Sequence, residues 1–233
     1  MNIKCIGSGS KGNAYLVNDG YTTLLIECGV PFKKIQLASK FKTNDIAACL
    51  VTHEHKDHCL CVKEMLKRGI ETVATSGTWK ELNIDPLHTP YATMIKSKVV
   101  MMTYGTFNVM AFNTEHDAAE PCGYLIHSNA TNEKLLYLTD SYYCKYKFND
   151  LTDIMIECNY DDESLINSND NIALRKRVLR SHMSLKNCIE FLKSNDLSRV
   201  DCIHLIHLSD RNSDEERMKR KVAEATGKRI EVF

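Results

Sequence analysis

The sequence has no excess of charge of either sign, because 30 lysine and arginine residues balance 30 aspartate and glutamate residues. A protein that binds long nucleic acid by its phosphates usually carries a basic excess or a basic stripe. Neutrality does not exclude a local basic patch. It nevertheless favours a small substrate over a long polyanion.

Long hydrophobic runs and secretory features are also missing. No apolar run approaches the roughly 20 residues that a transmembrane helix needs, and residues 1–5 lead directly into a strand-like pattern, so we expect no signal peptide. The ten cysteines lack the spacing of a disulfide framework and are expected to be reduced thiols. Together these features predict a cytoplasmic protein with no membrane partner.

No linker, low-complexity segment or short-period repeat interrupts the chain of 233 residues. Its content of 43% hydrophobic and 26% charged residues is that of a globular protein. A chain of this length suffices for one substantial domain and is short for two. We therefore expect a single domain over residues 1–233.

Four potential metal ligands stand within six residues, directly after the apolar run 45–51: His53, His55, Asp57 and His58. Imidazole nitrogens and a carboxylate suit zinc, and also manganese or iron. In an extended turn the first two histidines point the same way and can share one metal. Asp57 and His58 follow after the chain has turned, so their side chains can reach a second metal. A helix would instead present ligands four residues apart.

Three further candidates each follow an apolar, strand-like run: His116, Asp140 and His207. We expect His116 to complete the first metal site and His207 the second. An aspartate at a strand end is usually a turn residue, but beside a metal loop Asp140 could bridge two ions, since a carboxylate supplies two oxygens. His204 lies three residues before His207, so strand alternation places it on the opposite face.

Two features near the metal loop have competing interpretations. Cys59 and Cys61 are separated by one residue rather than the two of a zinc knuckle, which favours a structural role. The loop 7–13 is rich in glycine and serine, and could be a plain hairpin turn or bring backbone N–H groups to a ligand.

A basic run, residues 175–180, leads into Ser181-His182-Met183-Ser184. Such a run is usually a solvated helix face, but beside a candidate catalytic histidine it could also meet substrate phosphate. His182 has no ligand role in this scheme, so it could hold the phosphate or protonate the leaving oxygen. Ser184 is placed to cap the helix that follows.

The string His53-x-His55-x-Asp57-His58 resembles the signature of metallo-β-lactamase-fold hydrolases. The resemblance implies an α/β fold, a four-layer αβ/βα sandwich in which helices flank two mixed β-sheets. Redox-active di-iron members of that superfamily carry glutamate where this sequence has His55, so the hydrolase interpretation is preferred.

Further stretches resemble a small single-domain branch that includes YycJ-type exonucleases and phage anti-Pycsar phosphodiesterases, which destroy cyclic-nucleotide immune signals. These stretches are residues 7–13, 116–121, 157–161, 181–184 and 207–209. The resemblance implies that Asn13 supports the metal loop or faces the site, and that the protein is a homodimer. Met183 interrupts an expected histidine-leucine-serine string and Arg180 replaces an expected glycine, which leaves the substrate preference open.

The predicted site therefore has Asp57 and His182 as catalytic residues, and Asn159, Arg180 and Ser184 as substrate contacts. Two divalent ions, zinc first and manganese as an alternative, would convert a bridging water to hydroxide near neutral pH and clamp a phosphodiester for attack.

We expect a phosphodiesterase acting on 3′,5′-cyclic nucleotides, favoured by the zero net charge. The alternative is a metal-dependent exonuclease on single-stranded DNA or RNA, favoured by the branch resemblance and the basic run. A non-catalytic metal-binding module would be expected to lack ligands, yet every position is filled. Thioester or lactam hydrolysis is weakly disfavoured by the basic run and His182.

Overall fold

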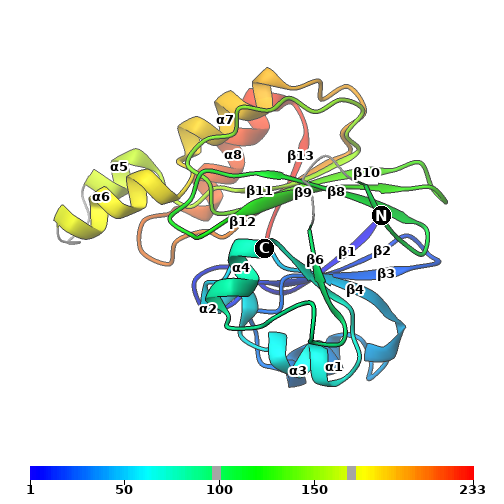
Figure 1. Ribbon diagram of the computed structural model, residues 1–233. Coiled ribbons are helices and arrows are strands. Elements are labelled where there is room, and N and C mark those ends of the chain that lie inside the picture. Colours follow the sequence, from blue (N-terminus) through cyan, green and yellow to red (C-terminus); the bar gives the residue numbers. More distant parts are fainter. Residues whose placement is uncertain (96–100, 167–171) are drawn as a thin grey trace. The chain divides into compact units, whose positions relative to one another are not determined.

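The computed structural model describes residues 1–95, 101–166 and 172–233 (Figure 1). The chain divides into two compact units. Unit 1 comprises Met1–Asn113 and Ala118–Asn132, and unit 2 comprises Thr114–Asp117 and Glu133–Phe233. Within the described residues no helix is long and apolar enough to span a membrane.

Unit 1 contains a six-stranded sheet in the order β1-β2-β3-β4-β5-β6. The first three strands pair antiparallel and the remainder pair parallel. Its strands are β1 (Asn2–Gly7), β2 (Ala14–Asn18), β3 (Thr23–Ile26), β4 (Ile46–Leu50), β5 (Thr72–Ala74) and β6 (Ala92–Met94). Its helices are α1 (Phe32–Ala38), α2 (Lys56–Cys59), α3 (Val62–Lys67) and α4 (Ser76–Glu81), with a 3-10 turn η1 (Thr43–Asp45).

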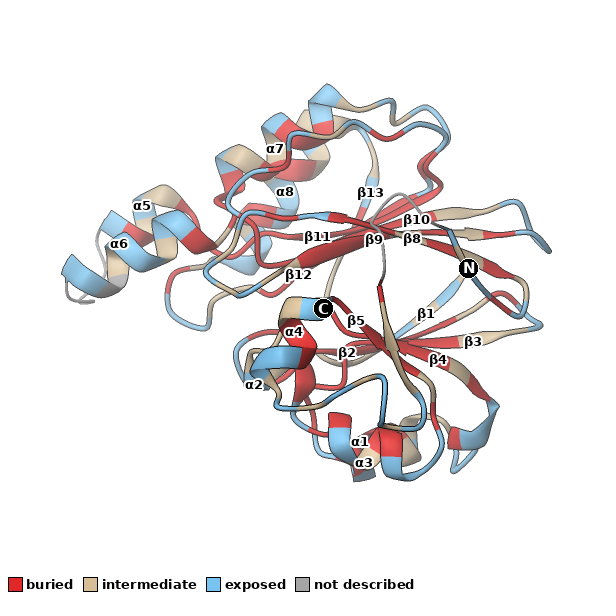
Figure 2. Cartoon of the chain, viewed as in Figure 1, coloured by how far each residue is buried: buried red, intermediate tan, exposed pale blue. Residues whose placement is uncertain are grey.

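One apolar core joins this sheet to its helices. Leu25 and Val51 from the sheet side pack in one cluster with Ile35 of α1, Met65 of α3 and Trp79 of α4. Figure 2 shows the corresponding strands and inner helix faces as buried. Strands that are buried on both faces have continuous apolar sequences. For this reason the apolar residues 46–51, which precede the metal loop, could be recognised as a strand.

Unit 1 also contains three antiparallel strands, β7 (Met102–Tyr104), β8 (Phe107–Asn113) and β9 (Cys122–Ser128). Phe107, Val109 and Ala111 alternate with more exposed positions along β8, the pattern of a strand with one buried face. The short apolar runs 99–102, 107–112 and 124–127 predict antiparallel strands at these places, and the structure confirms them for the described residues. Residues 96–100 lie outside the described part of the chain.

Unit 2 is built on four parallel strands: β10 (Lys134–Leu138), β11 (Asp153–Glu157), β12 (Cys202–Ile206) and β13 (Arg229–Val232). Its helices are α5 (Asp162–Ile166), α6 (Ile172–Ser181), α7 (Leu185–Ser194) and α8 (Glu215–Thr226). Because parallel strands end at one edge, residues that end or follow β10, β11 and β12 gather there. The α/β class with two mixed β-sheets and flanking helices is confirmed.

Two helix ends differ from what the sequence pattern predicts. The apolar spacing of Ile35, Ala38 and Phe41 after Pro31 predicts one helix through Phe41, but the helix ends at Ala38, and Phe41 is exposed with a φ of 63°. The spacing of Ser213 and Glu216 predicts a capping box. Instead Asp214 accepts from the backbone N–H of Arg217, while Ser213 donates its hydroxyl to the carbonyl of Ser209. A carboxylate caps a helix as well as a hydroxyl does, so the neighbouring aspartate took this position.

Candidate metal centre

The four donors of the metal loop lie together at the end of β4. The ring centroid of His53 is 4.6 Å from that of His55 and 4.2 Å from that of His58. His55 is extended and immediately precedes α2, while Asp57 and His58 stand in the first turn of that helix. The predicted order, in which an extended pair (His53 and His55) precedes a pair in a turn (Asp57 and His58), is therefore present.

A buried glutamate orients this loop. Oε1 of Glu27 accepts from the hydroxyl of Thr52 at 2.6 Å and lies 3.2 Å from Nδ1 of His58. The same hydroxyl lies 2.9 Å from Nδ1 of His53. Carboxylates that bind the far nitrogen of a histidine fix its tautomer and ring orientation for metal binding. Sequence reasoning missed Glu27, although a carboxylate directly after the buried strand β3 carries the same signal as Asp140.

The loop from residue 7 to residue 13 braces the metal loop. Asn13 is fully buried, and both its backbone N–H and its side-chain amide donate to the carbonyl of Asp57, at 2.7 and 3.2 Å. A Cβ at Gly29 would lie 1.7 Å from the same carbonyl oxygen, so only glycine fits there. The predicted support of the metal loop by Asn13 is confirmed.

A second cluster of donors lies in unit 2, where Asp140, Glu157, His182 and His207 each place a ligand atom within 4.8 Å of the others. Nδ1 of His182 lies 2.6 Å from Oε1 of Glu157 and 3.0 Å from Oδ1 of Asp140. The rings of His182 and His207 stack with centroids 5.4 Å apart. Glu157 was not predicted as a site residue, although it ends an apolar strand.

The charge of this cluster favours a cation. Burial lowers the pKa of His182, but the carboxylates of Glu157 and Asp140 outweigh this effect and raise it to about 10. Both carboxylates are at least 98% buried, so their charge needs a positive partner. Imidazole nitrogens with carboxylate oxygens are ligands that zinc and manganese accept. The donor set therefore fits a divalent metal.

Further contacts within unit 2 hold His116 and His207. Nδ1 of His116 lies 2.8 Å from the carbonyl of Ser181, so its N–H donates there and Nε2 carries the lone pair. Burial lowers the pKa of His116, which favours the neutral imidazole that a metal requires. Asn159 donates from Nδ2 to the carbonyl of His207 at 2.9 Å. It therefore positions a proposed ligand.

The other predicted substrate contacts differ in accessibility. Arg180 is exposed on α6, as a phosphate contact requires. Ser184 is buried, and its hydroxyl accepts from the backbone N–H of Asn187 as the cap of α7, as predicted. Cys59 donates to the carbonyl of Glu54, and Cys61 lies in the apolar core of unit 1. The structural interpretation of these two cysteines is confirmed.

Three of the residues above have left-handed backbone conformations. Glu27 follows β3 with a φ of 62°, Asp140 follows β10 with 44°, and His207 follows β12 with 55°. Residues with a Cβ rarely adopt such angles, and they persist where surrounding contacts hold them. The backbone is therefore strained at these three positions, each of which follows a strand. The amino-acid sequence carries no signal of these φ values.

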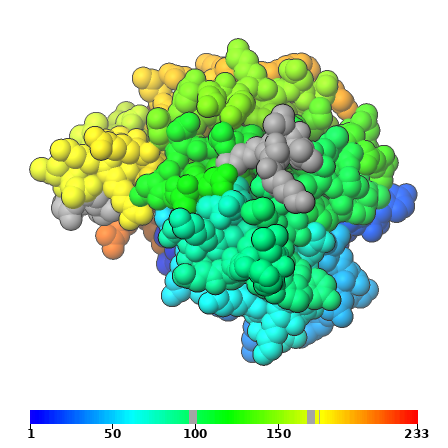
Figure 3. Space-filling model, in the orientation of Figure 1, coloured from blue at the N-terminus to red at the C-terminus, as the bar shows by residue number. Residues whose placement is uncertain are grey.

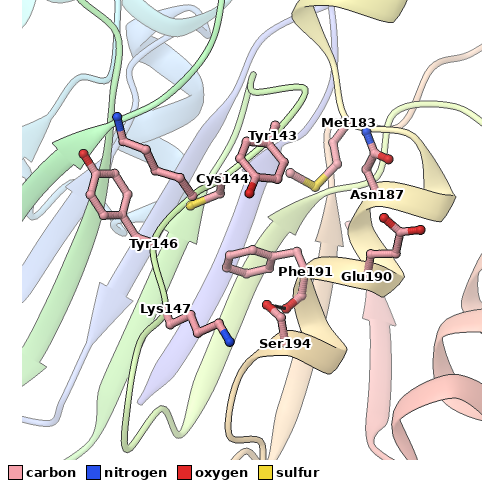
Figure 4. A pocket seen from close by; sticks show the side chains of 10 residues that line it. Tyr143, Cys144, Tyr146, Lys147, Met183, Asn187, Glu190, Phe191 and Ser194 are labelled. Atoms are coloured by element: carbon pink, nitrogen blue, oxygen red, sulfur yellow. Dashed lines mark hydrogen bonds between the residues drawn. The ribbon is translucent and has the colours of Figure 1, made fainter.

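A pocket of about 180 Å³ is lined by the segment 143–147, by Met183 and by α7. Figure 4 shows the ring of Phe191 between that segment and the helix. Tyr143 and Tyr146 contribute aromatic surface, and the segment also carries two lysines. The pocket thus combines apolar and cationic walls with one acidic side chain, Glu190.

Comparison with known proteins gives one family match and several relatives. Residues 22–205 match the family model described as β-lactamase superfamily domain. The chain is 27% identical to the exodeoxyribonuclease YycJ of Bacillus anthracis, over 96% of this chain and 88% of that protein. It is 28% identical to the exodeoxyribonuclease WalJ of Streptococcus pneumoniae, over 91% of this chain and 82% of that protein.

Among solved structures, the chain is similar to the metallo-β-lactamase-fold protein YhfI of Bacillus subtilis, with a TM-score of 0.76. The identity is 14%, and the alignment covers 99% of this chain and 95% of that one. At this identity the likeness concerns the fold alone, and it agrees with the predicted fold.

Proposed function

The chain belongs to the β-lactamase superfamily domain family, and from that premise we propose that it hydrolyses nucleotide phosphodiester bonds with two bound metal ions. Its family and its exodeoxyribonuclease relatives identify it as a metal-dependent hydrolase. The observation that carries the proposal is the cluster of Asp140, Glu157, His182 and His207, in which only His182 is partly exposed. We propose that residues 1–233 act as a single hydrolase domain.

The proposed ligands follow the sequence-based scheme. One ion is assigned to His53, His55 and His116, and the other to Asp57, His58 and His207, with Asp140 shared between them. When bound, two such ions lower the pKa of a coordinated water and offset charge on the phosphate. Zinc suits the histidine-rich set, and manganese is the alternative.

His182 is the proposed general acid. Its Nδ1 is engaged by Glu157 and Asp140, so Nε2 is the atom that would donate a proton to the leaving oxygen. Its side chain is 19% exposed, the most accessible in the cluster, as contact with substrate requires. Asp57 is 27% exposed and would accept a proton from the attacking water.

We favour a 3′,5′-cyclic nucleotide as substrate. The pocket lined by Met183, the residue after His182, has a size suited to one base, and its tyrosines and lysines suit a base with a phosphate. Zero net charge also favours a small substrate. In this case the biological role would be destruction of a cyclic-nucleotide immune signal, as in the anti-Pycsar enzymes of phages.

The second candidate is an exonuclease acting on single-stranded DNA or RNA. Both exodeoxyribonuclease relatives favour it, and so does the exposed Arg180 on α6. The other arginines of α6 support it less, because Arg177 is paired with Asp117 at 2.9 Å and Arg175 donates to the carbonyl of Ile166.

A product assay separates these candidates. Zinc- or manganese-loaded protein is incubated with a panel of 3′,5′-cyclic mononucleotides and with labelled single-stranded DNA and RNA, and His55→Ala serves as the metal-site control. Conversion of cyclic to linear monophosphate without trimming establishes the first candidate, and trimming alone establishes the second. If metal-replete protein attacks neither class, the phosphodiesterase proposal is wrong.

We also propose a homodimer in a reducing cytoplasm. Ile166, Ile172 and Leu179 expose large apolar side chains on α5 and α6, and residues 172–181 lie at the molecular surface in yellow (Figure 3). All ten cysteines are free thiols, as a reducing compartment would maintain them. Light scattering on the eluting protein tests the dimer, and a monomer at micromolar concentration would contradict it.

A further inference from the structure

A third group of potential ligands stands on two neighbouring strands of unit 2. Cys202 and His204 are two residues apart on β12 and therefore share a face. Glu231 of β13 is the direct partner of His204 in the parallel ladder. Each of these side chains offers a ligand atom within 4.8 Å of the other two.

The imidazole of His204 gives independent evidence for a bound ligand. It is 95% buried, yet its Nδ1 has no hydrogen-bond partner among the residues that the structure describes. Nδ1 instead faces Glu231, whose Oε2 lies 3.3 Å away, and the ring stacks on Phe233. A buried nitrogen that faces a carboxylate without forming a hydrogen bond to it is incompletely satisfied, and a metal ion bound by both groups would satisfy it.

We propose that Cys202, His204 and Glu231 bind a divalent metal of the zinc class, at a site separate from the candidate metal centre. A thiolate, an imidazole and a carboxylate are all zinc ligands, and three protein ligands leave a fourth position for water. The sulfur donor disfavours manganese. This inference does not depend on the proposed hydrolysis.

The surroundings of the triad are compatible with metal entry and release. The Glu231 side chain is 42% exposed, which gives the site a route to solvent. Its Oε1 lies 3.6 Å from Arg229, so a metal must compete with that ion pair. As the sulfur–metal bond forms, the thiol of Cys202 loses its proton to solvent. Because the ligands come from two strands, the metal would tie β13 to β12.

Cobalt titration of the full-length apoprotein tests this site. A thiolate bound to Co²⁺ gives a charge-transfer absorption in the near ultraviolet, and none of the ligands proposed for the candidate metal centre is a cysteine. We expect a saturable absorption in the wild type, its loss in Cys202→Ser, and its retention in Cys144→Ser, a matched buried cysteine. His55→Ala should lose hydrolysis but keep the absorption.

Glu231→Gln guards against a folding artefact, because this position is half-exposed on β13. It should weaken apparent cobalt affinity by about 10-fold or more without changing the far-ultraviolet circular dichroism. Absence of the absorption in the wild type at saturating cobalt, or its persistence in Cys202→Ser, would overturn the proposal. An inactive wild type with intact absorption would count against the proposed hydrolysis alone.

Discussion

The imidazole of His182 is oriented by two carboxylates, those of Glu157 and Asp140. Its Nδ1 lies 2.6 Å from Glu157, and Glu157 also accepts from the backbone N–H groups of Ser141 and Met183. The glutamate is thus fixed on three sides and cannot turn without breaking bonds. It fixes the ring of His182 through Nδ1, which leaves the Nε2 proton of the imidazolium for the substrate.

Glu157→Gln should lower kcat about 10- to 100-fold, because the neutral amide no longer stabilises the imidazolium or fixes the ring. KM should change little if the lost interaction acts in the transition state. Steady-state kinetics on the substrate identified by the product assay measure both constants. Glu224→Gln, at an exposed position on α8, is the control and should retain activity. An unchanged kcat in Glu157→Gln would show that Glu157 does not position His182.

Residue types and spacing were enough to propose the metal loop, Asp140 and His207 as candidate donors. Glu27 and Glu157 also stand at the ends of buried strands, but their roles depend on which side chains they meet in space. For the predicted substrate contacts, the structure shows Asn159 against His207 and Ser184 at a helix cap. Burial and local hydrogen bonds decide such roles, and a single sequence does not display them.

Among the elements, α7 depends on a capped first turn. Ser184→Ala should destabilise the protein by about 1 kcal/mol, because the backbone N–H of Asn187 loses its acceptor. Activity per folded molecule should not change. Urea denaturation measures the stability, and Ser198→Ala, at an exposed position, is the control. A raised KM with unchanged stability would instead support the substrate contact expected from the sequence.

Asp19 joins three elements of unit 1. Its carboxylate accepts from Thr106 and Ser128 at 2.6 Å each and from the backbone N–H groups of Tyr21 and Thr22. Burial raises its pKa, but these hydrogen bonds outweigh burial and lower it to about 2. The carboxylate therefore ties the β2–β3 turn to the β7–β8 turn and to the end of β9.

Asp19→Asn should cost about 1 kcal/mol near neutral pH. Because the native pKa lies below the unfolded value of about 4, this contribution is present above pH 4 and is lost as pH falls towards 2. Urea denaturation at pH 7, 5 and 3.5 should show a constant deficit at the two higher values and a smaller one at the lowest. Asp45→Asn, at an exposed position, is the control. A deficit that grows at low pH would contradict this sign.

The order and type of most elements were predictable, because apolar runs and glycine stops mark them. The C-terminal strand, for example, begins soon after Gly227, which ends α8 with a φ of 68°. The ends were less predictable. Phe41 continued the apolar spacing of α1, yet the backbone had already turned to positive φ at Lys40. Local turn conformations override side-chain periodicity at such positions.

For the molecule as a whole, metal binding should stabilise the folded state, because the ligands come together only on folding. Treatment with a chelator should therefore lower the thermal unfolding midpoint by several degrees. Re-addition of manganese should restore the midpoint in the wild type but not in His55→Ala. Manganese is chosen because the cysteine-containing triad disfavours it. An unchanged midpoint after complete metal removal would contradict a structural contribution from the centre.

We propose that one chain holds two metal ions on the assigned ligands. An anomalous difference map from crystals of manganese-loaded protein tests this proposal. We predict two peaks about 3.5–4 Å apart, one beside His53, His55 and His116, the other beside Asp57, His58 and His207. A single peak, or peaks away from these side chains, would contradict the dinuclear account.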